Sequence, residues 1–280
     1  MNRQQNNKGD KPMTQLIGAI CEKGNKIVTV SDRMVGTGDM TLTFEHEQPK
    51  AQVILKTAVV LTAGTMHEPD LIIDARERAR GRERIRDVAD ALKEVYQELR
   101  MQHIEDEILK PMAGLKSFEE YHTKQTTLHD SVVMEMNRRI KNYDLNSTLL
   151  LAGVDEKAHI LEIGNPGIWR SSDAVGYSTI GMGGRHADNV FAWYRYSIKL
   201  PLQEAAYIAF EAKKRAEMAG GVGAITDVLI IDKKGIQIVK PDTISKLEEI
   251  YSERESRQTR GTFDRNITEL KLQTDPFKNS

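Results

Sequence analysis

The apolar residues of this 280-residue chain change their spacing in blocks, and the order of those blocks is the strongest limit on its fold. Runs of β-branched and aliphatic residues bounded by turn residues predict strands, whereas apolar residues three and four positions apart predict helices. In chain order the sequence predicts four strands within 14–64, two helices within 68–140, three strands within 147–184, two helices within 186–219 and two strands within 226–239. Helices and strands are therefore segregated along the chain rather than alternating.

This segregation favours the α+β class, in which helices pack on the outer faces of stacked antiparallel sheets. We expect a four-layer αββα sandwich formed by residues 14–240, with an enlarged helical hairpin that contains an insertion at about 101–130. Residues 1–13 are expected to be a disordered leader, because a segment rich in Asn, Gln, Gly and Lys cannot bury an apolar face. Residues 241–280 are expected to form one short helix followed by a mobile polar tail.

The charge balance, the apolar runs and the cysteine count limit the partners and compartments that we expect for this chain. Lys and Arg number 40 against 41 Asp and Glu, so the net charge of -1 gives no reason to expect a nucleic acid or an anionic membrane as partner. No apolar run approaches the roughly 20 residues that span a bilayer, and the first residues lack the apolar middle of a signal peptide. Cys21 is the single cysteine, which excludes an intramolecular disulfide and a cysteine-rich metal site. We therefore expect a cytoplasmic protein.

Two conspicuous motifs have simple interpretations. The glycine-rich GMGGRH at 181–186 lacks the lysine-containing end of a phosphate loop, so it is interpreted as a turn. Glu45, His46 and Glu47 are adjacent, but neighbouring side chains of an extended segment point in opposite directions. We interpret them as solvated charges and expect no metal site.

The residues around Thr14 are the candidates for catalysis. An N-terminal threonine is both nucleophile and base, because its hydroxyl attacks a carbonyl while its α-amine, with a reference pKa of about 8, accepts the proton. Such a site also needs a cation beside the hydroxyl, a carboxylate to hold that cation, and a backbone N–H for the oxyanion. The chain offers these parts in order as Thr14, Asp32, Lys50 and Gly64.

The order and spacing of these residues resemble the β subunits of the proteasome and the related two-ring bacterial peptidase, which are N-terminal-nucleophile hydrolases. In that family a threonine opens the mature chain, a glycine follows four positions later, an acidic residue closes the second strand, a lysine begins the third and an Ala-Gly pair ends the fourth. The matching residues here are Thr14, Gly18, Asp32, Lys50 and the pair Ala63-Gly64. The later STIGMGGRHADNV resembles the family's glycine turn, and ITDVLIID resembles its penultimate strand.

The resemblance implies a role for each residue. Thr14 would be nucleophile and base, and Lys50 would lower the pKa of its hydroxyl. Asp32 would orient Lys50, and the Gly64 amide would stabilise the oxyanion. The chain would be a threonine-type endopeptidase that needs no cofactor, acts on peptides or proteins and forms a homo-oligomeric ring or stack, with an ATP-dependent unfoldase as a candidate partner. The pocket for the residue before the cleaved bond would be apolar and lined by Val35, Thr62 and Met66.

Two alternatives stay open. Where the family has a serine after the first glycine of the turn, this chain has Met182, and the family's Asp-x-x-Ser has no counterpart in residues 216–226. These departures favour a non-catalytic ring or scaffold subunit, whereas the presence of both Asp32 and Lys50 favours an enzyme. The same acyl-enzyme would also serve a transpeptidase or ligase.

Catalysis by Thr14 requires a free amine, yet Met13 precedes it. We expect the leader either to be removed or to reflect a misassigned start, with translation beginning at Met13 and loss of that methionine exposing Thr14. The codons of Lys8, Gly9 and Asp10 can form a purine-rich ribosome-binding sequence a short way upstream of Met13.

Overall fold

The computed structural model describes residues 14–36, 43–47, 49–64, 69–257, 267 and 270–276. Its helices and strands follow the predicted order of blocks, and the mixture of both agrees with the α+β class. The leader 1–13 and most of the segment 258–269 lie outside the described residues.

The first of two large sheets contains both ends of the described chain. Its antiparallel strands lie in the order β10-β1-β2-β11-β12-β13. Their bounds are β1 Gln15–Cys21, β2 Lys26–Asp32, β10 Tyr177–Gly181, β11 Thr226–Asp232, β12 Gly235–Val239 and β13 Thr274–Pro276. A short 3-10 turn, η1 Glu22–Gly24, joins β1 to β2.

The second sheet is a meander in the order β5-β6-β7-β8-β9, interrupted in sequence by the helical hairpin between β6 and β7. Its bounds are β5 Ala51–Leu55, β6 Ala58–Gly64, β7 Ser147–Val154, β8 Ala158–Gly164 and β9 Ile168–Ser171. A separate short ribbon pairs β3 Met34–Gly36 with β4 Thr43–Glu45.

The alternation of side chains along β1 explains how the two sheets and the helices pack. Leu16 belongs to an apolar cluster that both sheets share, together with Leu61 and Leu150 of the second sheet. Ile17 points to the opposite face, where it packs with residues of the helices α6 Gly184–Trp193 and α7 Leu202–Ala216. A strand buried on both faces reads as a continuous apolar run, as QLIGAIC does after its first residue.

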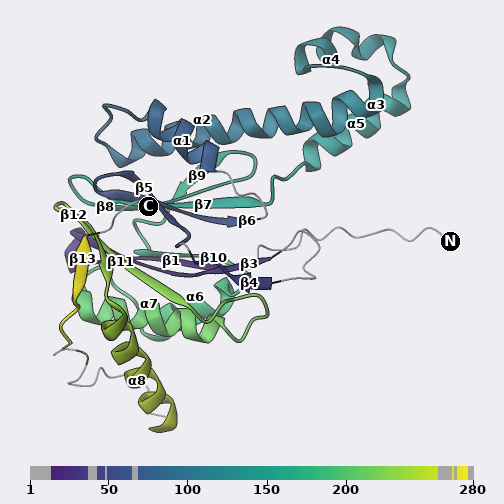
Figure 1. The fold of residues 1–280 in the computed structure, drawn as a ribbon. Coiled ribbons are helices and arrows are strands. Elements are labelled where there is room, and N and C mark those ends of the chain that lie inside the picture. Colours follow the sequence, from purple (N-terminus) through teal and green to yellow (C-terminus); the bar gives the residue numbers. More distant parts are fainter. Residues whose placement is uncertain are drawn as a thin grey trace.

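The outer face of the second sheet is covered by the helices α1 Pro69–Arg78 and α2 Ile85–Ile104. Figure 1 shows α1 and α2 beyond the second sheet and α6 and α7 beyond the first. The helix α8 Pro241–Arg257 follows β12 and packs through Leu247 against Tyr207 and Phe210 of α7.

Beyond Ile104 the helical hairpin extends into an arm that has its own apolar cluster. Its elements are η2 Glu105–Leu109, α3 Lys110–Ala113, α4 Phe118–Lys124, η3 Gln125–Thr127 and α5 Asp130–Asn142. Ile104, Leu109, Tyr121 and Met136 are buried at the centre of the arm. Figure 1 shows the arm projecting away from the two sheets, so the segment predicted as an insertion at about 101–130 forms most of it.

The strands β3, β4 and β9 were not predicted from the sequence, and two further segments differ from the prediction. The helix expected over 186–199 ends at Trp193, because Arg195 adopts a positive φ of 48° and Tyr196 turns back to donate a hydrogen bond to the carbonyl of Ile20. The tail expected to be mobile contains β13, which pairs with β12 at the edge of the first sheet. Ile267 is buried against α7 and α8, which anchors this return of the chain.

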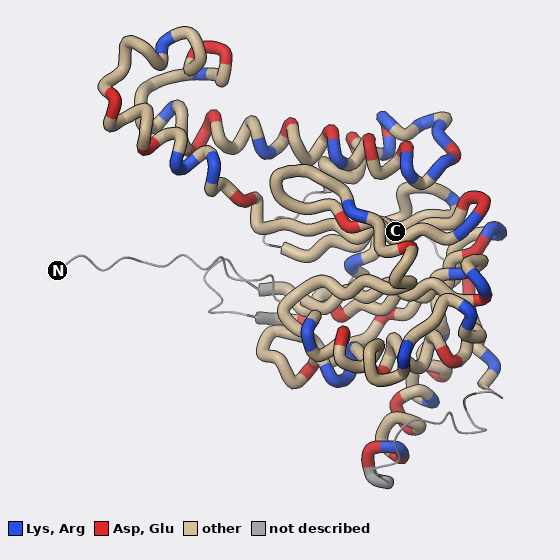
Figure 2. Tube along the Cα trace, turned by 180° about the vertical axis from the view of Figure 1, so that it is seen from behind, with Lys and Arg blue, Asp and Glu red and all other residues tan. Residues whose placement is uncertain are grey.

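The described surface carries both charge signs. Figure 2 shows acidic and basic residues interspersed along most of the helices, with basic residues gathered at the turn between α1 and α2. Among the described residues, no helix is both long enough and apolar enough to cross a membrane.

Candidate active site

Thr14 lies immediately before β1 and is held from the end of β10. Only 2% of the residue is exposed, and its carbonyl accepts a hydrogen bond of 3.1 Å from the N–H of Met182. Gly181 has a φ of 110°, and a Cβ at that position would lie 1.9 Å from the carbonyl oxygen of Thr14. The glycine turn interpreted from GMGGRH therefore serves to bring the backbone of β10 against Thr14.

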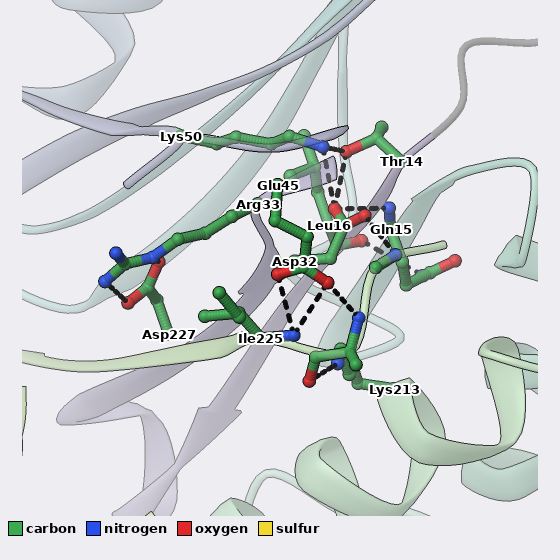
Figure 3. Close-up of polar contacts among 12 residues, drawn as sticks. Thr14, Gln15, Leu16, Asp32, Arg33, Glu45, Lys50, Lys213, Ile225 and Asp227 are labelled. Carbon is green, nitrogen blue, oxygen red and sulfur yellow. Dashed lines mark hydrogen bonds and ion pairs between the residues drawn. The ribbon is translucent and has the colours of Figure 1, made fainter. Parts of the chain in front are cut away.

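The hydroxyl of Thr14 lies between a carboxylate and an ammonium group (Figure 3). Its Oγ1 donates a hydrogen bond of 2.7 Å to Oδ1 of Asp32, and the same Oγ1 accepts a hydrogen bond from Nζ of Lys50. Nζ of Lys50 also donates to Oδ1 of Asp32 at 2.8 Å. The structure thus brings together three of the four residues predicted to be catalytic.

The elements that carry these residues come from both sheets. Asp32 ends β2 of the first sheet, and Lys50 immediately precedes β5 of the second sheet. Because the shared apolar cluster fixes one sheet on the other, it also fixes the position of Lys50 relative to Thr14. The site therefore forms only where the two sheets pack against each other.

Asp32 is a buried carboxylate with several hydrogen-bond donors. None of its surface is exposed. Besides the Thr14 hydroxyl and Lys50, Oδ1 accepts from the N–H of Gln15 at 3.0 Å, and Oδ2 accepts from the N–H of Gly223 at 2.8 Å. These donors fix the orientation of the carboxylate, so Asp32 can hold Lys50 in place.

Lys50 is the charged neighbour of the hydroxyl. Its side chain is 13% exposed, and burial lowers the pKa of its ammonium group, whereas the charge of Asp32 and the hydrogen bond to it act in the opposite direction. A cation in contact with Oγ1 favours the alkoxide form of Thr14 over the neutral hydroxyl. Asp32 and Lys50 together can activate Thr14 as a nucleophile.

Gly64 lies at the end of β6, opposite Ser147 of β7. Its φ is 149°, and a Cβ there would lie 2.3 Å from the carbonyl oxygen of Asn146, so the backbone requires glycine. The role of its N–H as oxyanion donor stays a prediction. Gly18, in the middle of β1, packs against Ile160 between the sheets.

The residues predicted to line a substrate pocket are only partly described. Val35 is a half-buried residue of β3, and Thr62 is a half-buried residue of β6. The Oγ1 atom of Thr62 is buried and has no hydrogen-bond partner among the described residues. Met66 lies outside the described residues. Their role in substrate binding stays a prediction.

Sequence reasoning missed several polar residues around Asp32. Glu45, interpreted above as a solvated charge, accepts hydrogen bonds from the N–H groups of Ala224 and Ile225, the latter at 3.0 Å. Lys213 of α7 is fully buried close to the same loop. The described part of the chain contains no group of three or more His, Cys, Asp and Glu side chains that could hold a metal ion.

Arg33 and Asp227 form a second ion pair beside the site. The Nε and one terminal nitrogen of Arg33 donate to the two carboxylate oxygens of Asp227 at 2.7 and 2.6 Å. This two-point contact joins the end of β2 to the start of β11. It stabilises the strand ends next to Asp32 and leaves Lys50 as the cation that contacts Thr14.

Comparisons with known proteins identify no family for the chain. It matches no protein-family model, and no curated protein matches its sequence. The functional interpretation therefore rests on the geometry around Thr14.

Proposed function

We propose that the chain is a proteasome-like N-terminal-nucleophile hydrolase, a threonine-type peptidase or amidase whose nucleophile is Thr14. The observation that carries the proposal is the contact of Thr14 Oγ1 with both Asp32 and Lys50 in a buried site. A structural threonine at the start of a strand has no need of a buried lysine on its hydroxyl, because burying an ammonium group is costly. The arrangement has the parts of an activated nucleophile.

The packing of the elements supports a four-layer αββα architecture. From one side to the other, α1 and α2, the second sheet, the first sheet, and α6 and α7 share three successive apolar clusters. Thr14 begins an inner strand of this arrangement, next to β10 and β2. That position suits a residue whose amine and hydroxyl must both face one carbonyl.

In the proposed reaction, Oγ1 of Thr14 attacks the carbonyl carbon of an amide, and the proton of the hydroxyl passes to the free α-amine of Thr14. Lys50 stabilises the developing negative charge on Oγ1, and the N–H of Gly64 stabilises the oxyanion. Collapse breaks the C–N bond, the α-ammonium returns the proton to the leaving amine, and an ester on Thr14 is left. Water then cleaves this ester with the same α-amine as base.

The α-amine can act in this way only when Thr14 is the first residue. With Met13 attached, the nitrogen of Thr14 is an amide and cannot accept a proton. The proposal therefore requires that residues 1–13 be absent or be removed before the enzyme acts. In the structure the hydroxyl hydrogen is directed to Asp32, and release of the amine supplies a second acceptor at Thr14 itself.

The protein before and after removal of residues 1–13, together with the variant Thr14→Ala, tests this function. A specific protease site is inserted directly before Thr14, and the folded protein is assayed before and after cleavage against a panel of short fluorogenic peptides. We expect turnover only after cleavage, and none when Thr14 is replaced in Thr14→Ala. Equal turnover by cleaved Thr14→Ala would contradict the proposal. Addition of a peptide amine to the cleaved wild type separates hydrolysis from acyl transfer, because transfer yields a ligated product.

A non-catalytic ring or scaffold subunit is the second candidate. Met182 favours it, since the backbone N–H of Met182 binds Thr14 while its side chain offers no hydrogen-bonding group that could relay a proton. This candidate predicts that the native protein retains Met13 and that a Lys50→Met variant assembles normally. For both candidate functions we propose that the protein is a cytoplasmic homo-oligomer, and sedimentation velocity measures its assembly directly. For the enzyme we also propose an ATP-dependent unfoldase as partner.

A further inference from the structure

The segment 217–225, which we call the strap, joins α7 to β11 and reaches Asp32 from the side opposite to Lys50. Its contribution to the site is one backbone group, because the N–H of Gly223 donates to Oδ2 of Asp32 at 2.8 Å. A Cβ at Gly223 would lie 2.7 Å from Oε1 of Glu45 and 3.0 Å from Cβ of Met34. The backbone of the strap at Gly223 therefore lies in close contact with Glu45 and Met34 where it reaches Asp32.

One anchor of the strap is Lys213, a fully buried residue near the end of α7. Its Nζ donates to Oε1 of Glu217 at 2.6 Å and to the carbonyl oxygen of Ala224 at 2.8 Å. These two contacts join the first residues of the strap to its last ones. A buried ammonium group requires such partners, and here both of them belong to the strap.

The other anchor is Glu45 of β4. Both of its carboxylate oxygens accept from the N–H of Ile225 at 3.0 Å, and one of them also accepts from the N–H of Ala224. Ala224 is thus held at its N–H by Glu45 and at its carbonyl by Lys213. Gly223, the residue that reaches Asp32, immediately precedes this doubly held residue.

We propose that Lys213 is a positioning residue for the Thr14 site, which it serves by holding the strap so that the N–H of Gly223 stays on Asp32. The inference rests on the proposed function for its catalytic consequence, whereas the anchoring itself does not depend on it. Loss of this N–H would leave Oδ2 of a fully buried carboxylate without its donor. Asp32 would then hold Lys50 and the Thr14 hydroxyl less firmly.

The charge of Lys213 acts on the same residues. Burial is the main cause that lowers the pKa of Lys50, and the positive charge of Lys213 adds to this effect, while Asp32 and Glu45 oppose it. Burial likewise lowers the pKa of Lys213, and Glu217 and Asp32 oppose that shift. A purely structural position of this depth would be filled more stably by an apolar side chain of similar volume.

Amide hydrogen exchange on the full 280-residue chain tests the anchoring without any assay of activity. In Lys213→Met, we expect the N–H groups of 223–225 to exchange about tenfold faster than in wild type, because their opening no longer breaks the contacts of Lys213. The matched control is Lys214→Met. Lys214 is the next residue of α7, and its side chain is 15% exposed. It binds Glu217 at 2.8 Å and Glu248 at 3.2 Å, so it contacts the first residue of the strap but, unlike Lys213, not Ala224 at its end. Exchange in Lys214→Met should equal that of wild type.

Equal protection of 223–225 in Lys213→Met and wild type would overturn the inference. If Lys213→Met does not fold, as judged by its thermal unfolding, Glu45→Gln decides, because it weakens the opposite anchor without a change of size. We expect it to speed exchange at 223–225 in the same direction, and unchanged exchange there would overturn the inference.

The catalytic consequence is measured separately, as the rate at which a β-lactone acylates chains cleaved before Thr14. We expect about 10- to 100-fold slower acylation in Lys213→Met, with the alkaline limb of the pH profile moved to higher pH, and an unchanged rate in Lys214→Met. Equal rates and equal pH limbs in Lys213→Met and wild type would overturn the positioning role. If the cleaved wild-type protein is not acylated, the proposed function fails. The hydrogen-exchange data then decide by themselves whether Lys213 holds the strap.

Discussion

Nζ of Lys50 lies 2.8 Å from Oδ1 of Asp32, although Lys50 precedes a strand of the second sheet and Asp32 ends a strand of the first. The ion pair therefore crosses the boundary between the sheets, and Thr14 Oγ1 contacts both of its members. The pair, and with it the site, can therefore form only where the two sheets have packed together.

Replacement of Lys50 by methionine should affect both stability and reactivity. Lys50→Met leaves the carboxylate of Asp32 buried without its cation, which typically costs about 3–5 kcal/mol in the free energy of unfolding. It also removes the charge that favours the alkoxide of Thr14, so acylation by a β-lactone should fall by about 10²- to 10³-fold. Urea unfolding and the acylation rate measure the two effects.

The control for this variant is Lys26→Met. Nζ of Lys26 lies 3.6 Å from Asp232 at the surface, and its side chain is 35% exposed. Its loss should change the free energy of unfolding by at most about 1 kcal/mol and leave acylation unchanged. Acylation of Lys50→Met at the wild-type rate would show that Lys50 does not activate Thr14.

The acylation rate should depend on pH through two groups. It should rise as the free amine of Thr14 loses its proton near its reference pKa of about 8. It should fall again as Lys50 loses its proton. This alkaline limb should lie below the ordinary lysine pKa of 10.5. Burial lowers the pKa of Lys50 more than Asp32 and Glu45 raise it, and the charge of Lys213 adds to the lowering. A rate that still rises above pH 10.5 would contradict this assignment.

The backbone contact at Gly181 should be essential for the position of Thr14. Gly181→Ala places a Cβ 1.9 Å from the carbonyl oxygen of Thr14, in addition to a φ of 110° that disfavours alanine. Gly24→Ala is the matched control, because its φ is 90° but nothing lies within 4 Å of the added Cβ. We expect Gly24→Ala to cost about 1–2 kcal/mol in the free energy of unfolding. Gly181→Ala should cost clearly more and abolish acylation; equal costs would show that the contact is easily relieved.

Cys21 should report unfolding of the first sheet. It is the single cysteine of the chain, it is fully buried in β1, and burial raises the pKa of its thiol to about 12. Alkylation by iodoacetamide at pH 8 should be at least about 10³-fold slower in the native protein than in denaturant, because both the thiolate and access to it are lacking. Rapid labelling under native conditions would show that β1 opens readily.

The residues of the site differ in how far the sequence could predict them. Thr14 and Lys50 each precede an apolar run and Asp32 ends one, and it was the resemblance of their order to that of proteasome β subunits that led us to expect one site. Lys213 stands in the run Lys-Lys-Arg at a helix end, which by itself is typical of exposed cations. Its burial depends on the return of the strap over α7, a long-range contact that leaves no mark in the local pattern.

The same reason accounts for the errors in the fold. Thr274–Pro276 is a three-residue edge strand that contains a proline and follows a polar segment, so no alternation marks it. The end of α6 depends on a positive φ at Arg195, a residue type that rarely adopts it. In both places contacts with distant residues, Val239 for β13 and Ile20 for the turn after α6, decide the local structure.

The most direct measurement of the central claim is the site of acylation in the folded chain whose first residue is Thr14. After reaction with a β-lactone, intact mass and peptide mapping should locate a single adduct, an ester on Oγ1 of Thr14 that hydroxylamine releases and that Thr14→Ala does not form. An adduct on another residue, or no adduct in a folded chain whose N-terminal Thr14 has been verified by sequencing, would contradict the account.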